Sequence, residues 1–351
     1  MHTFYFMRQK VLVIKLGSAV ITNAIGNINK AVIKKIVEDI AALNQSYKIV
    51  LVSSGAVSSG KKYIQDYKGS LLQRKVAAAI GNPILIQLYR HYFQKRGLTV
   101  AQALCERSHF SNRKQFLQLR DTFKTFWQHN VIPVVNENDV ISDLELKFSD
   151  NDELATLLAI AFDAETLVLC TSVGGFLDDK KKILKEIRSI NADVLSLVKK
   201  GEKSEFGLGG MLSKLTFTRL ATNLGINVIM CGLQSATPVS DALHKKTGSF
   251  FYAQKSDLKN RQKWLASGSI TLGKIRLDKG AAKAVAERKS LLTVGIVAIE
   301  GRFATGEVVQ LMNEDGVIIG VAKAKLGSSE LKKHLKEKNI VAAHANDIVL
   351  I

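Results

Sequence analysis

Several apolar segments of this chain end in turns whose residues could bind phosphate. Val13–Ser18 places Lys15 inside an apolar segment, with Gly17 and Ser18 at its end. A buried lysine is costly unless it meets an anion, and glycine lets backbone N–H groups approach a phosphate closely. The spacing is not that of a Walker A loop, so an edge-strand lysine that points to water explains this segment equally well.

A glycine-rich segment, Gly207–Lys214, is a second candidate for phosphate binding. It places flexible backbone directly before a helical pattern that carries Lys214 in its first turns. Glycines permit close phosphate approach, a helix N-terminus favours negative charge, and Lys214 could follow the charge onto a transferred group. A glycine-rich hinge is the alternative.

Three further turns offer hydroxyl, amide and carboxylate groups. Val52–Ala56 contains two serines and a glycine, and a serine helix cap would be enough to explain it. Asn136–Asp139 and Ser149–Asp152 are acidic, amide-rich turns whose oxygens could bind an ammonium group or Mg²⁺. Helix capping accounts for part of the second of these turns and leaves the first unexplained.

The segments between these turns alternate short β-branched runs with longer amphipathic stretches. This pattern predicts an α/β fold in which a mainly parallel sheet is sandwiched between helix layers. Helices are predicted over Lys30–Asn44, with Ile33, Ile36, Val37 and Ile40 on one face, and over Glu153–Ala161. Strands are predicted at Val11–Leu16, Lys48–Val52, Val100–Leu104, Val131–Val135, Thr166–Cys170 and Asn227–Met230. Ligands of open α/β sheets bind beyond the carboxyl ends of the strands, which is where the polar turns fall.

After about residue 260 the pattern changes to short strands and glycine turns, such as Gly306–Leu311 and Val317–Ala322. The small-residue linker Ala266–Ser269 predicts a boundary there. We therefore expect a larger domain over 8–265 and a small β-rich domain over 270–351.

The formal net charge is +19 and the isoelectric point is near 9.7, which would attract phosphate groups. Residues 270–351 hold 13 Lys and Arg against 9 Asp and Glu, so the remaining residues carry +15 of the total. We interpret this excess as a lysine-rich solvated surface rather than a nucleic-acid footprint.

No apolar run reaches the roughly 18 residues that a membrane span needs. Residues 1–10 lack the apolar core of a secretory signal, and Cys105, Cys170 and Cys231 suggest neither a disulfide framework nor a zinc motif. A cytoplasmic location is expected.

Taken in order, the turns resemble the amino acid kinase superfamily, and most closely the bacterial glutamate 5-kinases. The resemblance rests on Val-Ile-Lys-Leu-Gly-Ser, Val-Ser-Ser-Gly-Ala, Asn-Glu-Asn-Asp, Asp-Asn-Asp and Gly-Gly-Met-Leu-Ser-Lys, and it covers essentially the whole chain. Arg107–Asp121 resembles the segment that precedes the Asn-Glu-Asn-Asp turn in these kinases. The tail, with Leu277–Ala281 and Gly306–Val309, is similar to a PUA domain.

This resemblance implies an ATP-dependent phosphotransferase that makes L-glutamyl 5-phosphate from L-glutamate, the first step toward proline. It implies Lys15, Asp152 and Lys214 as catalytic residues, with Asp152 organising the two lysines. Glutamate would be bound by Ser54, Asp139 and Asn151. The ATP-binding residues would be Lys15, Gly17, Ser18, Thr171, Ser172, Gly209, Gly210, Met211, Leu212, Ser213 and Lys214. Mg²⁺ would bridge the ATP phosphates with few or no protein ligands.

Two positions depart from the family pattern. Ser172 stands where many members have an aspartate after the threonine, and Leu208 stands where arginine or threonine often precedes Gly-Gly-Met. Thr171, Gly209, Gly210 and Lys214 follow the family pattern.

The resemblance also implies proline as a feedback inhibitor, a homo-oligomer and a downstream reductase. A competing hypothesis is RNA binding by the PUA-like tail, but the modest charge of +4 argues against this as the main activity. RNA binding that falls steeply with salt and disappears on removal of residues 270–351 would favour that alternative.

Overall fold

A computed structural model describes residues 9–23, 27–141, 151–200, 208–255 and 273–350 of the chain. The chain divides into two compact units, of which one contains a large sheet and the other a small one. The predicted boundary between 265 and 270 lies outside the described residues, as do Ser149, Asp150 and Gly207.

Eight strands form the large sheet among the described residues. In spatial order they are β3 (Thr99–Cys105), β4 (Val131–Glu137), β2 (Tyr47–Ser53), β1 (Lys10–Leu16), β5 (Thr166–Cys170), β7 (Asn227–Cys231), β8 (Ser249–Phe251) and β6 (Glu186–Ile187). The strands from β3 to β7 all run parallel, whereas β8 is antiparallel to β7. The prediction of a mainly parallel sheet is confirmed, and the six predicted strands differ from the observed ones only at their ends.

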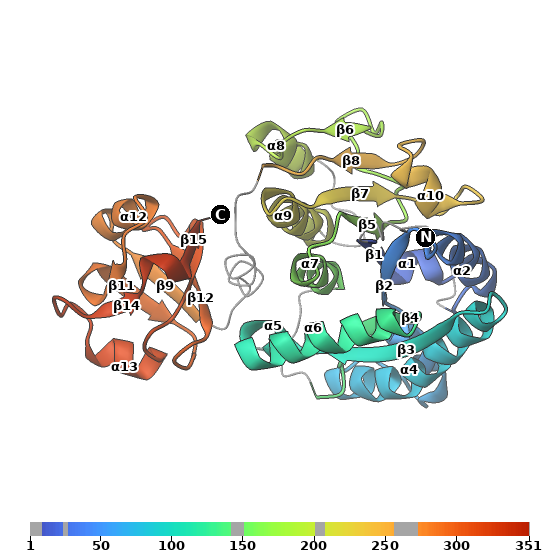
Figure 1. The fold of residues 1–351 in the computed structure, drawn as a ribbon, viewed down its shortest axis with the longest axis horizontal. Coiled ribbons are helices and arrows are strands. Elements are labelled where there is room, and N and C mark those ends of the chain that lie inside the picture. The colour runs from blue at the N-terminus through green and yellow to red at the C-terminus, as the bar shows by residue number, and fades with distance from the viewer. Residues whose placement is uncertain (1–8, 24–26, 142–150, 201–207, 256–272, 351) are drawn as a thin grey trace, which may run out of the picture. The chain divides into compact units, whose positions relative to one another are not determined.

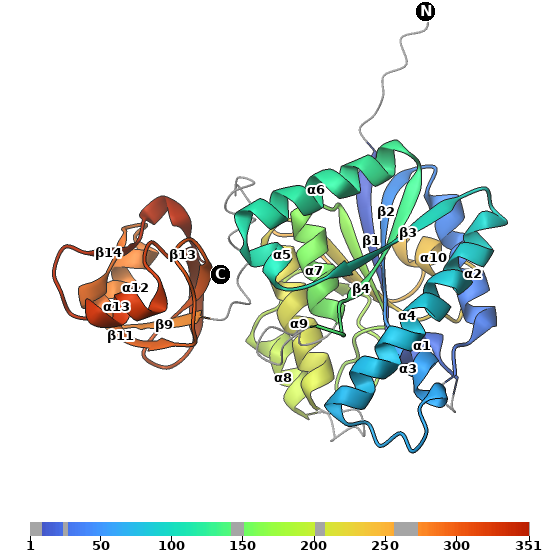
Figure 2. The same ribbon diagram turned by 90° about the horizontal axis from the view of Figure 1, so that it is seen from below.

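Helices cover both faces of this sheet (Figure 1). One face carries α2 (Lys30–Leu43), α4 (Leu71–Gln94) and α10 (Pro238–Leu243), and the other carries α6 (Arg113–Gln128), α7 (Asn151–Ala161), α8 (Ala192–Lys200) and α9 (Leu208–Asn223), as Figure 2 also shows. Helices of four or five residues are α1 (Ser18–Ile21), α3 (Ala56–Gly60) and α5 (Ser108–Ser111). None of the helices that the structure describes is long and apolar enough to cross a membrane.

The helical periodicity of α2 explains how the first face is built. Ile33, Ile36, Val37 and Ile40 are buried as predicted, and they pack with residues of α4 and of the central strands. The Asn29 side chain accepts a hydrogen bond from the Val32 amide and so begins the helix. Burial of the apolar stripe fixes α2 against the sheet.

The long helix α4 packs unusually closely against α3. A Cβ atom at Gly60 would lie 1.9 Å from the Ala77 carbonyl oxygen, and a Cβ atom at Gly81 would lie 1.8 Å from the Ala56 carbonyl oxygen. Only glycine fits at these two positions. Because α3 directly follows the turn after β2, this contact fixes the position of that turn at the carboxyl edge of the sheet.

The C-terminal unit contains a five-stranded sheet with the order β11 (Ile296–Glu300), β9 (Gly273–Leu277), β12 (Val308–Met312), β13 (Ile318–Lys323) and β15 (Ile348–Leu350). A second pairing joins β10 (Leu291–Leu292) to β14 (Val341–Ala343), and the helices are α12 (Lys279–Ala286) and α13 (Ser328–Lys333). A separate apolar core includes Ile275, Leu311 and Leu331. The β-rich prediction for this region is confirmed.

Candidate active site

Two lysines that are far apart in the sequence contact the same buried carboxylate. Lys15 is the penultimate residue of β1, Asp152 lies in the first turn of α7, and Lys214 lies in the second turn of α9. The Asp152 Oδ1 atom is 2.5 Å from Lys15 Nζ, and Asp152 Oδ2 is 2.6 Å from Lys214 Nζ. The structure therefore brings together the three residues that were predicted to be catalytic.

The arrangement is electrostatically asymmetric. Asp152 is fully buried, and Lys15 is only 6% exposed, whereas the Lys214 side chain is 21% exposed. Burial by itself would raise the pKa of Asp152, but the Lys15 and Lys214 ammonium groups outweigh it and hold that pKa below its ordinary value. Two cations share one anion, so these three side chains together carry one excess positive charge, which suits an anionic ligand.

Beside this trio, polar side chains form a chain of hydrogen bonds. Asn151 Nδ2 lies 2.9 Å from Ser54 Oγ and 3.1 Å from Asn136 Oδ1, and it donates to both. Asn136 in turn donates to Asn82 Oδ1 at 3.0 Å. Asn82 and Asn136 are almost fully buried, so their hydrogen bonds restrict the positions of Asn151 and Ser54 beside the trio.

Sequence reasoning missed the contribution of Asn82 and named Asn136 only as part of an acidic turn. Asn82 lies in the middle of α4, where the amide interrupts the buried face between Ala78 and Leu85. A single amide among buried apolar positions is a signal that it has a polar partner. The sequence does not show which residue that partner is.

Thr171 and a pocket beside it lie at the same edge of the sheet. The Thr171 amide donates to the Cys231 carbonyl at 2.7 Å, and the Thr171 hydroxyl accepts from the Gly174 amide at 3.2 Å. The pocket has a volume of about 370 Å³ and is lined by Val173, Gly174, Ile183, Lys185, Gly232, Gln234, Ser235, Lys245, Lys246, Thr247 and Gly248. The residues after β5 and β7 and those before the antiparallel β8 all belong to the carboxyl edge, the edge that holds Lys15.

The other predicted site residues occupy the same edge with differing exposure. Gly17 precedes α1, and a Cβ atom there would lie 3.5 Å from Lys15 Nζ. Ser18 and Ser172 are exposed, and Asp139 is half-buried in the turn after β4. Met211 and Ser213 are half-buried in α9, which also contains Gly209, Gly210 and Leu212.

The start of α9 differs from the expectation of flexible backbone before the helix. The helix begins at Leu208, so Gly209 and Gly210 lie within its first turn. The first four N–H groups of an α-helix have no partner within the helix. The glycines therefore supply helix N-terminal amides rather than a loop, which suits phosphate binding equally well.

The cysteines, although distant in sequence, include one close pair. All three lie among the described residues and carry buried free thiols. Cys170 and Cys231 end the neighbouring strands β5 and β7, and their Sγ atoms are 4.0 Å apart. Within the described residues, no group of three or more His, Cys, Asp or Glu side chains lies close enough together to hold a metal ion.

Comparisons with known proteins show which families the two parts of this sequence match. Residues 10–232 match the amino acid kinase family, and residues 273–344 match the PUA domain. The chain is 37% identical over 328 residues to the glutamate 5-kinase of Aquifex aeolicus, which covers 92% of this chain and 91% of that protein. It is 33% identical over 350 residues to the glutamate 5-kinase of Sodalis glossinidius, which covers 97% of this chain and 93% of that protein.

Among solved structures, the fold is similar to that of a carbamate kinase from Giardia lamblia bound to AMP-PNP. The TM-score is 0.53 at 19% sequence identity, over 70% of this chain and 99% of that chain. This similarity concerns the fold alone.

Proposed function

Because this chain belongs to the amino acid kinase family, we propose that it transfers the γ-phosphate of ATP to the side-chain carboxylate of L-glutamate. A carboxylate oxygen attacks the γ-phosphorus, the bond from that phosphorus to the β-phosphate oxygen breaks, and ADP leaves with the electron pair. The products are L-glutamyl 5-phosphate and ADP. The observation that carries the proposal is the Lys15–Asp152–Lys214 trio.

The attacking carboxylate is already ionised near neutral pH, so the reaction needs no general base. Its main obstacle is the negative charge of the nucleophile and the phosphates. Lys15 and Lys214 would neutralise the charge on the transferred phosphoryl group and on the leaving oxygen. Asp152 contacts the ammonium groups of both lysines, and its role would be to hold them at a fixed separation.

The substrate amino acid would be bound by the polar groups beside the trio. The Ser54 hydroxyl and the Asn151 amide lie 2.9 Å apart and could hydrogen-bond one carboxylate or ammonium group together. Asp139, half-buried in the turn after β4, would attract the ammonium group. Glutamate as the acceptor is supported by the names of the relatives that this chain resembles over most of its length.

The nucleotide would occupy the same edge of the sheet. Gly17, Ser18 and the N-terminal turns of α9, from Gly209 to Lys214, could bind its phosphates, and Thr171 begins the loop that lines the neighbouring pocket. We expect Ser172, exposed at this edge, to contribute less than Thr171. Mg²⁺ would enter with ATP and be held by its phosphates, since Asp152 is already paired with two lysines.

The direct test is an acyl-phosphate trapping assay. Protein, ATP, Mg²⁺ and L-glutamate are incubated with hydroxylamine, and formation of the γ-hydroxamate is expected. Acetylglutamate, aspartate and uridylate serve as alternative acceptors. Phosphorylation of one of these with no reaction of glutamate would disprove the substrate assignment.

The roles of the lysines need variants with a matched control. Lys15→Ala and Lys214→Ala should each lower kcat by about a hundredfold or more, the cost typical of losing one transition-state contact. Lys10→Ala is the control, because Lys10 lies on the same strand β1 and pairs with Glu165 at the surface. Near-normal rates in both active-site variants, with circular dichroism unchanged, would refute the assignment.

A downstream reductase is proposed as a partner of this enzyme. The acyl phosphate product is reactive, so a reductase that consumes it promptly would limit its hydrolysis. Proline inhibition, assembly into a homo-oligomer and a cytoplasmic location are proposed on the family resemblance. The domain limits 8–265 and 270–351 are likewise proposals.

A further inference from the structure

Most of the pocket at the carboxyl edge is built by two segments that flank one short helix. Gly232, Gln234 and Ser235 precede α10, and Lys245, Lys246, Thr247 and Gly248 follow it. The pocket-lining segments therefore share α10 as their common anchor. Any shift of α10 must move both walls.

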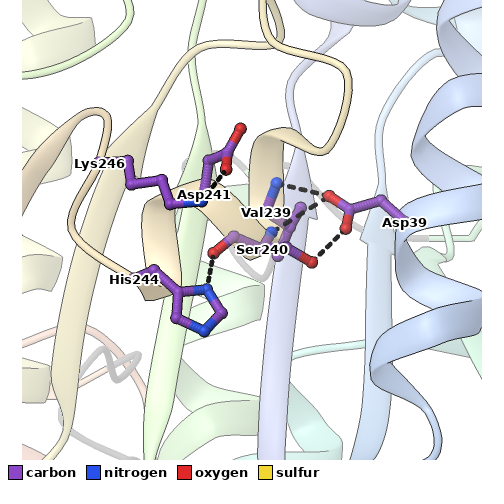
Figure 3. Close-up of polar contacts among 6 residues, drawn as sticks. All are labelled: Asp39, Val239, Ser240, Asp241, His244 and Lys246. Carbon is purple, nitrogen blue, oxygen red and sulfur yellow. Dashed lines mark hydrogen bonds and ion pairs between the residues drawn. The ribbon is translucent and has the colours of Figure 1, made fainter.

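Side chains of helix α2 hydrogen-bond to α10 and to the segment before it. The Asp39 carboxylate accepts hydrogen bonds from the Val239 amide at 2.7 Å and the Ser240 amide at 3.2 Å, and also from the Ser240 hydroxyl (Figure 3). Four residues earlier on α2, the Lys35 ammonium group donates to the Leu233 carbonyl. Two side chains of α2 thus fix both α10 and the segment that leads into it.

The position of Asp39 is unusual for a residue that only caps a helix. Val239 and Ser240 occupy the positions whose amides an N-cap side chain normally satisfies, and the local N-cap residue is Thr237. Among the described residues, the side chain that accepts from these amides is that of Asp39, which lies 200 residues before Val239 in the sequence, and not that of Thr237. Asp39 is 3% exposed, so its charge would be costly to bury without these three donors.

The contacts continue from α10 to the pocket wall. The Ser240 carbonyl lies 2.7 Å from His244 Nδ1, and Asp241 pairs with Lys246 at 3.3 Å (Figure 3). Lys246 belongs to the pocket-lining segment that follows α10, and Leu233, whose carbonyl accepts from Lys35, lies between the lining residues Gly232 and Gln234 of the segment that precedes it. Asp39 through α10, and Lys35 through Leu233, therefore connect α2 to both pocket-lining segments.

We infer that Asp39, supported by Lys35, is a positioning residue that sets the shape of this pocket and thereby the affinity for the nucleotide. The inference rests on the proposed function in one respect, namely that the pocket receives part of ATP. Asp39 contacts neither the lysine trio nor Ser54 and Asn151 in the described structure. Its loss should thus change nucleotide binding and leave the chemical step and glutamate binding intact.

The principal variant is Asp39→Asn, which presents an amide N–H₂ to backbone donors. We expect KM for ATP to rise about tenfold, the equivalent of one charge-assisted hydrogen bond, while kcat and KM for glutamate change by less than about twofold. Glu38→Gln is the matched control, because Glu38 is the neighbouring carboxylate on α2 and pairs with Arg96 at 2.7 Å. Its kinetics should equal those of the parent protein.

A rescue experiment separates positioning from simple capping. Thr237→Asn places a strong local N-cap beside the amides of Val239 and Ser240. Added to Asp39→Asn, it should restore the melting temperature but leave KM for ATP raised, since the link to α2 stays broken; Thr237→Asn alone should leave KM unchanged. Restoration of both quantities would overturn the inference, as would an unchanged KM in Asp39→Asn.

Two milder variants keep the inference testable if Asp39→Asn fails to fold. Ser240→Ala removes one of the three bonds and should raise KM for ATP about threefold, and Lys35→Met should act in the same direction, with the exposed Lys34→Met as its control. Unchanged KM values in both would refute the inference.

Calorimetry of ADP binding tests the role of Asp39 separately from the phosphorylation of glutamate. A weaker ADP affinity in Asp39→Asn supports the inference whichever acceptor is phosphorylated. Failure of the parent protein to phosphorylate glutamate refutes the proposed function alone.

Discussion

The two units of this chain differ most in what they bury. The unit with the large sheet buries charged side chains, among them Lys15, Asp39 and Asp152. Among the described residues of 273–350, the polar residues that are buried as a whole are Thr293 and Ser328, and neither is charged. Because buried charge is costly, it is retained where it supports chemistry or positions another element. The proposed Lys15–Asp152–Lys214 site lies in the first unit, in keeping with this contrast.

The carboxylates of the two units also differ in how far along the sequence their hydrogen-bond partners lie. In the C-terminal unit, Asp278 caps its own helix α12 by accepting from the Ala281 amide at 2.7 Å. In the larger unit, Asp39 serves α10 across 200 residues of sequence, and Asp152 connects β1 with α9. A local cap stabilises one element, whereas these long-range contacts fix the relative positions of several.

The largest effect that would test this contrast is expected from Asp152→Asn. The neutral amide would leave Lys15 and Lys214 side by side without their shared anion, so the lysines would move apart. We expect kcat to fall by at least about a hundredfold, measured by hydroxamate formation. Asp278→Asn in the C-terminal unit is the control and should leave kcat unchanged. Equal losses in the two variants would remove the distinction between the units.

The same variant makes a prediction about pH. The pKa of Asp152 is lower in the folded protein than its ordinary value, so its stabilising effect is complete above the unfolded pKa of about 3.9. That effect is lost as the pH falls through the folded pKa. The stability difference between the parent protein and Asp152→Asn should therefore be constant from pH 8 to 5 and shrink below about pH 4. A difference that declines already between pH 8 and 6 would contradict this cause.

Glycine-to-alanine substitutions should cost much more unfolding free energy in the larger unit than in the C-terminal unit. Gly81→Ala forces a Cβ atom to within 1.8 Å of the Ala56 carbonyl oxygen and should cost about 3 kcal/mol of unfolding free energy. Gly280→Ala, in the first turn of α12, would place its Cβ atom 3.4 Å from Asp278 Oδ1. Its cost should be below about 0.5 kcal/mol. Denaturant titration measures both, and a tolerant Gly81 would mean that α3 and α4 can separate freely.

A smaller effect is expected from the buried amides behind the substrate site. Asn82→Ala removes the acceptor of the Asn136 amide and should raise KM for glutamate about tenfold with KM for ATP unchanged. Asn44→Ala is the matched control, because Asn44 makes a similar amide bond of 3.1 Å to Asn130 at the surface. If the two variants behave alike, the buried amides serve stability and not substrate binding.

Local patterns predicted where the polar turns lie, whereas the roles of Lys15, Asp152 and Lys214 came from the family resemblance and stay predictions. Apolar periodicity defined the strands and α2, and the polar turns fell where parallel strands end, which brings Lys15, Ser54 and Thr171 to one edge. The sequence could not predict which residues become partners through tertiary packing. Nothing local indicates that Asn82 faces Asn136, that Gly60 and Gly81 allow two helices to touch, or that Asp39 caps a helix 200 residues away.

The smallest predicted effect lies in the C-terminal unit and tests the contrast from the other side. Thr293 is fully buried, and its hydroxyl donates to the Glu337 carbonyl at 2.9 Å. Thr293→Val keeps the shape and removes this bond, so it should cost about 1 kcal/mol of stability, seen by calorimetry as a lower melting temperature. Because this bond joins two residues of the C-terminal unit and involves no charged group, kcat and both KM values should stay within about twofold of the parent. A larger kinetic change would mean that the C-terminal unit contributes to catalysis, and buried charge would then no longer be a sufficient guide to where the chemistry resides.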